Sequence, residues 1–340
     1  MDTLTAAGLV AGRRARRRRE IRGLVGRRLL WTVPLLVMIS LGLFVLADAS
    51  PFDPLVGYLG DRYQFTSTAQ REAITAALQL DQGWWSAWTA WLADVARGDL
   101  GHSRSYAMPV ASVVAERLPW TLLLSATGLV IAVALGLAGG LVAAFRPGSW
   151  VDRVASGLAL IAQAVPPFVL ALAAVVVGAL ALGWFPAGGA RPVVGAVTWV
   201  GVAHHLVLPA LVLGVSQTPW LLLTVRAEAT EALASDPVRG AVTRGVGWAQ
   251  VVRGHVLPAA LVPLVTLVGV RLPELIVGAV LVEEVFAWPG LAAALVTSAR
   301  TLDLPLLAFL TVTSTALVLL GSLLADLAYL AIDPRVRADD

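Results

Sequence analysis

Long apolar stretches alternate with short arginine-bearing connections along the whole 340-residue chain. A helix of about 20 mostly apolar residues is long enough to cross the hydrocarbon core of a bilayer. Six stretches reach that length, and their residue ranges are 29–48, 119–145, 154–182, 206–225, 259–281 and 305–330. The pattern therefore predicts an all-α integral membrane protein with six transmembrane helices.

Arginine residues are unevenly distributed among the connections between these stretches. Positive residues that flank membrane helices accumulate on the cytoplasmic side. Of the 25 arginines, 17 lie in one alternating set of connections and 7 in the other, and Arg271 lies inside the fifth stretch. The arginine-rich set comprises residues 1–28, 146–153, 226–258 and 331–340. We therefore expect these segments, and with them both termini, to be cytoplasmic.

Nine arginines fall within residues 13–28. Runs of this kind also occur in nucleic-acid-binding and nuclear-targeting segments. Directly ahead of an apolar stretch, the run is more typical of the cytoplasmic flank of a first membrane helix. We therefore expect membrane lipid, and no nucleic acid, as its partner. A cleaved signal peptide fits less well, since residues 29–47 are about long enough to span a membrane, whereas the apolar region of a signal peptide is shorter.

Composition agrees with a membrane protein and narrows the chemistry that the chain can perform. It is 58% hydrophobic and 14% charged, whereas soluble domains are about 45–50% apolar and about 25% charged. Without cysteine it has no disulfides, iron–sulfur clusters or thiolate metal sites. Without lysine it lacks the P-loop residue that neutralises nucleotide phosphates. We therefore expect no cofactor or metal in this chain, and any ATP to be bound by another chain.

The long connection between the first two stretches predicts a small ordered layer of helices. Trp84, Trp88, Trp91 and Val95 follow the i, i+4, i+7, i+11 spacing of one helical face. A tryptophan face of this kind suits the membrane–water interface. It suits equally well packing of the layer onto the protein's own membrane helices.

Residues 235–258, SDPVRGAVTRGVGWAQVVRGHVLP, contain residues that are typical of the beginnings and ends of short helices. Ser235 and Asp236 can cap a helix, and Pro237 fits its first position. Gly245 can end the helix in a left-handed conformation. This predicts a helix over 237–244, followed by a second short helix around 248–255. Such short helices are marginal alone, so we expect them to dock onto a partner; a surface loop that contacts only lipid headgroups is the alternative.

The same stretch resembles the EAA loop of binding-protein-dependent ABC importer permeases, in the form found in the oligopeptide, dipeptide and nickel branch. In that form an acidic residue, two others and an arginine lead into an Ala…Gly pattern that ends at Leu-Pro. Here Arg239 and Gly240 replace the glutamate and first alanine of the general motif, and His255 replaces an aliphatic residue. With Pro237 included, the residues expected to couple to an ATPase are Asp236, Pro237, Arg239, Ala241, Arg244, Gly245, Leu257 and Pro258.

Three further segments resemble the same branch in the same order. They are residues 97–125, which enter the second span, residues 282–291 (VEEVFAWPGL) in the last external loop, and residues 323–337 at the C-terminal end. Residues 50–54 (SPFDP) depart from the Pro-Gly-Asp-Pro turn that is usual in the family. The resemblance therefore covers the chain from the first span to Arg337.

The resemblance implies a MetI-like permease fold with an external helical layer, and a permease subunit in a bacterial inner membrane rather than an enzyme. It implies a homologous second permease, one or two cytoplasmic ATPase subunits that bind ATP and magnesium, and an extracytoplasmic substrate-binding protein. The expected organisation is an arginine-rich extension (1–28), the first helix with the external segment (29–118), a five-helix core (119–330) with the coupling loop 226–258, and a tail (331–340).

The external loop and two histidines carry weaker signals. In the loop, the candidates for an external gate or for docking of the binding protein are Glu283, Phe286, Pro289 and Gly290. An acid–base pair at Glu283 and Glu284 is less favoured than a structural role. His204 and His205 are adjacent, so they do not share a helix face, and an interface position is favoured over a metal site.

Arg271 and Glu274 lie three residues apart within the fifth stretch, on one helix face, with Pro273 between them. Charges inside a membrane are costly and usually face a protein interior or an aqueous path, often as pairs. The resembling family tends to have neutral residues at these positions. The pair is therefore either structural or part of the translocation pathway.

The most consistent function is the permease subunit of an ATP-driven importer for peptides or related small solutes. A nickel or other-solute importer of the same branch is an alternative. A secondary transporter would need inverted repeats and broken helices, and a membrane enzyme would need a convergent catalytic set; we find neither in the sequence.

Overall fold

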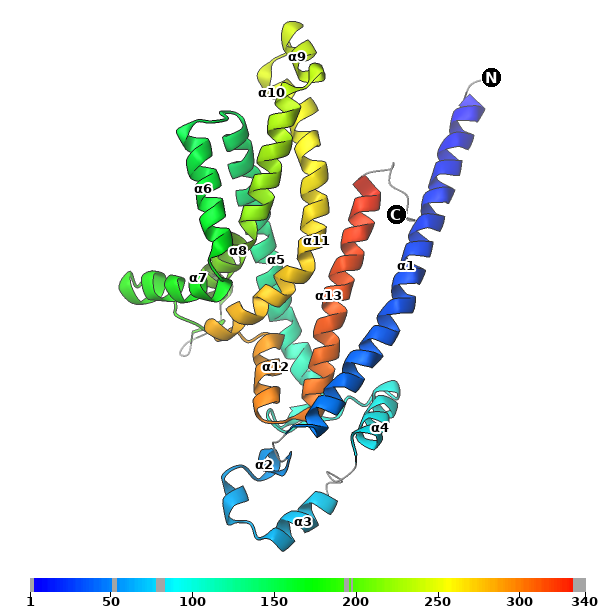
Figure 1. The fold of residues 1–340 in the computed structure, drawn as a ribbon, viewed down its shortest axis with the longest axis vertical. Helices are drawn as coiled ribbons and strands as arrows, with labels where there is room; N and C mark the ends of the chain where they lie inside the picture. The colour runs from blue at the N-terminus through cyan, green and yellow to red at the C-terminus, as the bar shows by residue number, and fades with distance from the viewer. Residues whose placement is uncertain (1–2, 51–53, 78–82, 193–195, 197, 333–340) are drawn as a thin grey trace. The chain divides into compact units, whose positions relative to one another are not determined.

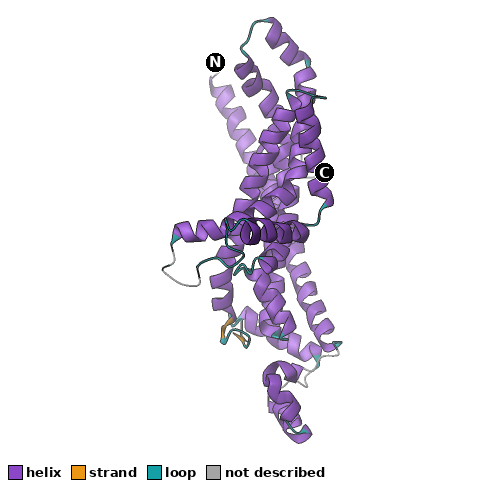
Figure 2. Cartoon of the chain, turned by 90° about the vertical axis from the view of Figure 1, so that its left-hand side faces the viewer, coloured by secondary structure: helices purple, strands orange, loops and turns teal. Residues whose placement is uncertain are grey.

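The computed structural model describes residues 3–50, 54–77, 83–192, 196 and 198–332. Figure 2 shows that this part of the chain is almost entirely helical. The long helices are α1 (Thr3–Asp48), α5 (Val110–Ala144), α8 (Trp199–Ala234), α11 (Leu257–Val285) and α13 (Leu304–Ile332). Within the described residues, strands are limited to the two-residue pair β1 (His102–Ser103) and β2 (Met108–Pro109).

Shorter elements connect these helices. They are α2 (Pro54–Leu59), η1 (Gly60–Phe65), α3 (Thr68–Ala77), α4 (Trp84–Ala96), α6 (Trp150–Ala164), α7 (Pro167–Ala174), η2 (Val175–Ala181), α9 (Asp236–Thr243), α10 (Trp248–Val251), η3 (Val252–Val256) and α12 (Leu291–Arg300). Here η1 is a 3₁₀ helix, whereas η2 and η3 are π-helical. The predicted tail, 331–340, lies almost wholly outside the described residues.

Five helical stretches in the described part of the chain are long and apolar enough to cross a membrane, and a bent pair makes a sixth. The five are Ile21–Asp48, Val110–Ala144, Trp199–Ala234, Trp248–Val285 and Leu304–Ala328. They cover five of the six predicted stretches, except at the ends of the second and last. With the bent pair as the sixth span, they confirm the expected six-helix architecture. The short helices that follow the first span agree with the expected helical layer.

The third predicted span, 154–182, is not one straight helix. It is divided into Trp150–Ala164 and Pro167–Ala181, which meet at an angle of 104°. The break lies at Pro166 and Pro167, because the residue before a proline is pushed out of the helical region. Val165 is accordingly extended, with φ −90° and ψ 122°. The two prolines therefore interrupt the span rather than merely kink it (Figure 1).

The chain forms two compact units. The first contains Met1–Thr32, Leu124–Phe286 and Leu317–Asp340, and the second contains Val33–Leu123 and Ala287–Ala316. The helices α1, α5 and α13 contribute residues to both.

In the first unit, α8 packs closely along α5 through small residues. A Cβ atom added to Gly136 would lie 2.6 Å from the Cβ of Leu221, and one added to Gly140 would lie 2.7 Å from the Cβ of Val225. Small residues let membrane helices approach each other at backbone distance. Any larger residue at these two glycines would force the helices apart. Close contact with α5 therefore fixes the position of α8.

In the second unit, the tryptophan face of α4 packs inward. Trp88 is buried with Phe44 of α1 and Ala308 of α13, and Trp84 and Trp91 pack against the same cluster. The indole Nε1 of Trp88 donates a hydrogen bond of 3.1 Å to Ser40 Oγ. Of the two predicted roles for this face, the structure favours packing onto the protein's own helices.

The hairpin β1–β2 in the second unit is fastened to the turn between α12 and α13. Ser103 Oγ donates a 2.7 Å hydrogen bond to Asp303 Oδ2, and the Ser105 amide donates to the same oxygen at 3.0 Å. Ser103 and Asp303 are completely buried. These bonds hold the segment that enters α5 against a distant part of the chain.

Candidate functional site

The helix α9 forms where the sequence predicts the first short helix, but it spans Asp236–Thr243 rather than 237–244. Ser235 stands at the N-cap position without a side-chain cap, which corrects the predicted cap. Its hydroxyl instead donates a 2.6 Å hydrogen bond to the carbonyl of Ala232, at the end of α8. Because Pro237 has no N–H, this helix start has one backbone donor fewer to satisfy than a start without proline, and the missing cap costs correspondingly less.

Gly245 ends α9 as predicted. Its φ is +76°, in the left-handed region that favours glycine. The amide of Val246 donates to the carbonyl of Ala241 at 3.1 Å, and the amide of Gly245 donates to that of Val242 at 2.9 Å. These are the two bonds of a Schellman motif. The direction in which the chain leaves α9 therefore depends on this glycine.

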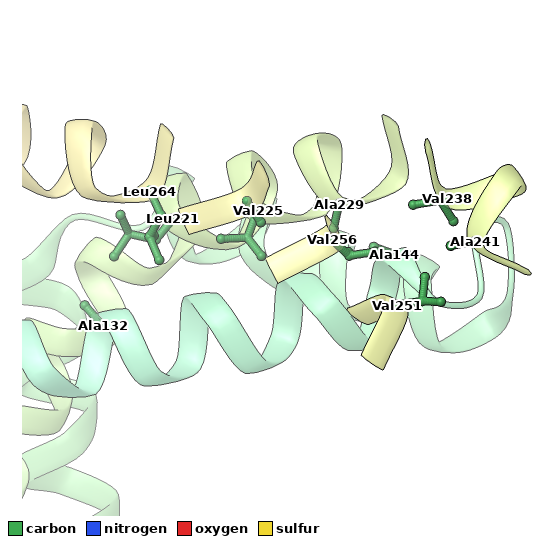
Figure 3. Packing of buried hydrophobic residues seen from close by; sticks show 11 residues of the cluster. Ala132, Ala144, Leu221, Val225, Ala229, Val238, Ala241, Val251, Val256 and Leu264 are labelled. Carbon is green, nitrogen blue, oxygen red and sulfur yellow. The ribbon is translucent and has the colours of Figure 1, made fainter. Parts of the chain in front are cut away.

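One face of α9 is buried against the same chain. Val238 and Ala241 belong to a hydrophobic cluster that continues into the membrane helices (Figure 3). The other members of the cluster are Ala132, Ala144, Leu221, Val225, Ala229, Val251, Val256, Ala260 and Leu264. Asp236, Pro237 and Arg239 of α9 are exposed, and so is Arg244 at its C-cap. Thus α9 is anchored from within and presents charges outward.

The second short helix predicted around 248–255 is not separate, which is a correction. Residues Trp248–Val285 form one continuous helical stretch through α10, η3 and α11 (Figure 1). Its π-helical part, Val252–Val256, directly precedes Leu257 and Pro258. Proline lacks an N–H and clashes with the carbonyl four residues earlier, and a wider turn relieves such a clash. Because the helix continues from Trp248 to Val285, Leu257 and Pro258 lie inside it and not at its start.

An ion pair that the sequence analysis missed lies near this segment. Asp152, in the first turn of α6, is engaged by Arg226 of α8 through both Nε and Nη2. Asp152 Oδ2 also accepts a 2.8 Å hydrogen bond from the amide of Gly148. The Asp152 side chain is only 3% exposed. The two residues are 74 positions apart, so their spacing gives no signal in the sequence. A signal for Asp152 alone is the helix-start pattern at Ser149, whose hydroxyl accepts a hydrogen bond from the Asp152 amide.

Arg271 and Glu274 form an ion pair within α11. The guanidinium carbon of Arg271 lies 4.0 Å from the ring centre of Trp220 on α8, a cation–π contact. The Arg271 side chain is 19% exposed and that of Glu274 is 55% exposed. The structure therefore joins the two predicted residues with a third, Trp220, that the sequence analysis did not single out.

The four predicted external-loop residues are largely enclosed. Glu283 and Phe286 are buried, Gly290 is buried, and Pro289 is partly exposed. The carbonyl of Phe286 accepts a 2.8 Å hydrogen bond from the amide of Gly189. Enclosed side chains are poorly placed for direct contact with a docking protein.

The two histidines at the start of α8 hold a neighbouring loop. His204 Nε2 donates to the carbonyl of Trp184 at 2.8 Å. His205 Nδ1 lies 3.1 Å from the carbonyl oxygen of Gly188 and 3.2 Å from that of Gly189. Both rings thus make structural bonds to the backbone.

Comparison with known proteins gives a consistent result. Residues 136–338 match the family described as "Binding-protein-dependent transport system inner membrane component". A putative peptide permease of Brucella suis is 35% identical over 311 residues, 91% of this chain and 97% of the relative. The oligopeptide transport system permease AppB of Bacillus subtilis is 33% identical, with 92% and 98% covered. The glutathione transport permease GsiC of Escherichia coli is 32% identical, with 92% and 97% covered.

Among solved structures, the inward-facing MetNI methionine ABC transporter contains a similar chain. The TM-score is 0.51 at 19% sequence identity, and the match covers 66% of this chain and 97% of that chain. At this identity the likeness supports the fold alone.

We expect Gly245→Val to loosen the end of α9 by about 1 kcal/mol or more, since a β-branched residue strains at positive φ. A Cβ at this position meets no atom within 4 Å, so the effect is conformational rather than a clash. Hydrogen exchange of the α9 amides should speed up about fivefold or more. Gly254→Ala is the control, because Gly254 has neither positive φ nor a close neighbour. Equal protection in both variants would contradict this account of the helix end.

We expect Asp152→Asn to destabilise the purified protein by about 1–3 kcal/mol, because it leaves Arg226 without its carboxylate. Denaturant unfolding in detergent micelles measures the change. Asp94→Asn is the control, since the Asp94–Arg97 pair is exposed and such pairs contribute about 0–1 kcal/mol. Equal losses of unfolding free energy in the two variants would show that the buried pair stabilises the protein no more than the exposed pair does.

Proposed function

The chain belongs to the family of binding-protein-dependent transport system inner membrane components, and we propose the solute class and the contacts through which it works. Membership makes it a multi-pass inner membrane permease subunit of an ATP-driven ABC importer, and it implies ATPase and substrate-binding partner chains. It also sets aside the alternative of a secondary transporter. The finer assignments below are our proposal.

Peptides or related small solutes are the proposed cargo. The supporting observation is that relatives matching over nine-tenths of the chain are named for peptides, oligopeptides and glutathione. Glutathione is itself a tripeptide, so the three names share one chemistry. A nickel importer of the same branch is less favoured, because both adjacent histidines bind backbone carbonyls.

The proposed complex also contains a homologous second permease and one or two ATPase subunits, which bind ATP and magnesium. Both termini lie in the cytoplasm in this proposal. Its support is the arginine distribution, together with the ion pair between Arg28 of α1 and Asp326 of α13. That pair brings the arginine-rich flank and the end of the last helix to the same region of the first unit.

Coupling to the ATPase is proposed to run through α9, Leu257 and Pro258. The exposed charges of Asp236 and Arg239 in α9, and of Arg244 at its C-cap, are available to a partner surface. The buried residues Val238 and Ala241 join α9 to the cluster that contains Leu221 and Leu264. Because a close-packed interior transmits displacement rather than absorbing it, a push on α9 moves α8 and α11. The Asp152–Arg226 pair extends that movement to α6.

Arg271 and Glu274 are proposed to line the translocation pathway. The supporting observation is that more than half of the Glu274 side chain is exposed, whereas the carboxylate of the Asp152–Arg226 pair is only 3% exposed. Glu283 and Phe286 in the first unit, and Pro289 and Gly290 in the second, are proposed as external-gate residues, since the burial of Glu283, Phe286 and Gly290 suits a closing element better than a docking surface.

The proposed function is tested by reconstituting the permease with its partner chains in liposomes. We expect ATP-dependent accumulation of a labelled oligopeptide only when permease, ATPase and binding protein are all present. The isolated permease should hydrolyse no ATP, because it has no lysine for a P-loop. Hydrolysis by the pure subunit, or accumulation of nickel but no peptide, would overturn the proposal.

The coupling surface is tested by reversing one exposed charge. We expect Arg239→Glu to reduce co-purification of the ATPase at least tenfold, because like charges placed across an interface repel and raise its cost by more than about 1 kcal/mol. Arg191→Glu applies the same change to an exposed residue of the connection before α8 and should leave co-purification intact. Equal co-purification of both variants would remove α9 from the ATPase interface.

A further inference from the structure

An exposed stripe of α11 carries a single charge in the first unit. Val270, Glu274, Val277 and Leu281 follow i, i+4, i+7, i+11 spacing, which places them on one helix face. All four are exposed, with Val270 64% and Val277 60% accessible. The stripe lies inside the spanning stretch Trp248–Val285. One carboxylate thus stands in an otherwise apolar face at membrane depth.

The ion pair is arranged with its negative member outward. Arg271 is mostly covered, because its guanidinium carbon lies 4.0 Å from the ring centre of Trp220 and its Nη1 donates to Glu274 Oε2. Glu274 makes no other hydrogen bond within the described residues, so Oε1 is available on the exposed side. A solute passing the stripe therefore meets a carboxylate oxygen first and meets the arginine only behind it.

Exposure of this carboxylate calls for a polar environment. A charged side chain at the centre of a span is costly when it faces lipid, and a neutral residue would pack equally well among the valines. A glutamate on this exposed face is therefore explained by water or by a cation beside it. An anion is disfavoured there, because the positive charge of Arg271 is covered by Trp220 on one side and neutralised by Glu274 on the other.

We propose that Glu274 is a recognition site for a cationic group of the solute, a primary ammonium or a guanidinium. Val270 and Val277 contact the uncharged part beside that group. Arg271 is a positioning residue, which holds the carboxylate in place while Trp220 holds Arg271. This inference rests on the proposed pathway, and it adds to that pathway a preference for positive over negative solute groups.

Val277→Cys provides the probe, since the chain has no natural cysteine and residue 277 is one turn from Glu274. The intact complex in vesicles is treated at low ionic strength, where screening is weak. A positively charged and a negatively charged methanethiosulfonate of similar size are used in each nucleotide state. Mass spectrometry of the peptide that contains the introduced thiol gives the two rates, and a free thiol in solution gives the reference ratio.

We expect the positive reagent to be favoured several-fold over the reference ratio. Glu274→Gln should return the ratio to the reference, and so should the double variant Arg271→Gln/Glu274→Gln, which leaves no charge unpaired if the single variant assembles poorly. Arg271→Gln alone should keep or increase the preference, because the carboxylate remains. Glu231→Gln, at an exposed glutamate of α8 outside the stripe, should change nothing.

Two outcomes would overturn the inference. No reaction of the introduced thiol in any nucleotide state would mean that protein or lipid covers the stripe. An unchanged rate ratio without Glu274 would mean that the carboxylate does not select. Neither depends on the cargo: a Glu274-dependent preference combined with failure of peptide import would reject peptides as the solute and keep the site.

Discussion

Close packing between α5 and α8 is the constraint on which the first unit depends. Gly136 and Gly140 leave no room for a side chain beside Leu221 and Val225, so the two helices touch along their backbones. In a bilayer, contact of this kind replaces the hydrophobic force that drives packing in water. Once α8 is fixed in this way, its C-terminal part holds Arg226, and its last residues lead directly into α9. Both candidate sites, α9 and the Trp220–Arg271–Glu274 cluster, are thereby placed by one helix.

The two ion pairs of this unit differ in a way that separates their roles. Asp152 is enclosed and fully bonded, by Arg226, by the amide of Gly148 and by Ser156. Such a carboxylate has no capacity left for a ligand and serves the arrangement of helices. Glu274 is bonded on one side only and remains open on the other. Burial and bonding capacity, rather than the presence of charge, therefore distinguish a structural pair from a candidate recognition site.

Local signals in the sequence predicted the elements that local chemistry determines. Apolar length located the spans, and the glycine at position 245 located the end of α9, because both depend on neighbouring residues alone. The break at Pro166 and Pro167 lies within the stretch predicted as one span, 154–182, and its angle of 104° depends on packing. The Asp152–Arg226 pair joins residues 74 positions apart, and the Trp220–Arg271 contact joins two helices. Neither could be read from spacing, since tertiary structure creates them.

The π-helical turn at Val252–Val256 lies within the helical stretch Trp248–Val285 and affects how the two ends of that stretch are rotated relative to each other. An α-helix advances by about 100° per residue around its axis, and a π turn holds one residue more than an α turn. The turn therefore sets the rotational phase between Trp248, near α9, and the Glu274 stripe farther along the same stretch. If the same residues formed a regular α-helix, the two faces would turn relative to each other by about a quarter of a revolution. The wider turn, and not the number of residues alone, thus aligns the two faces.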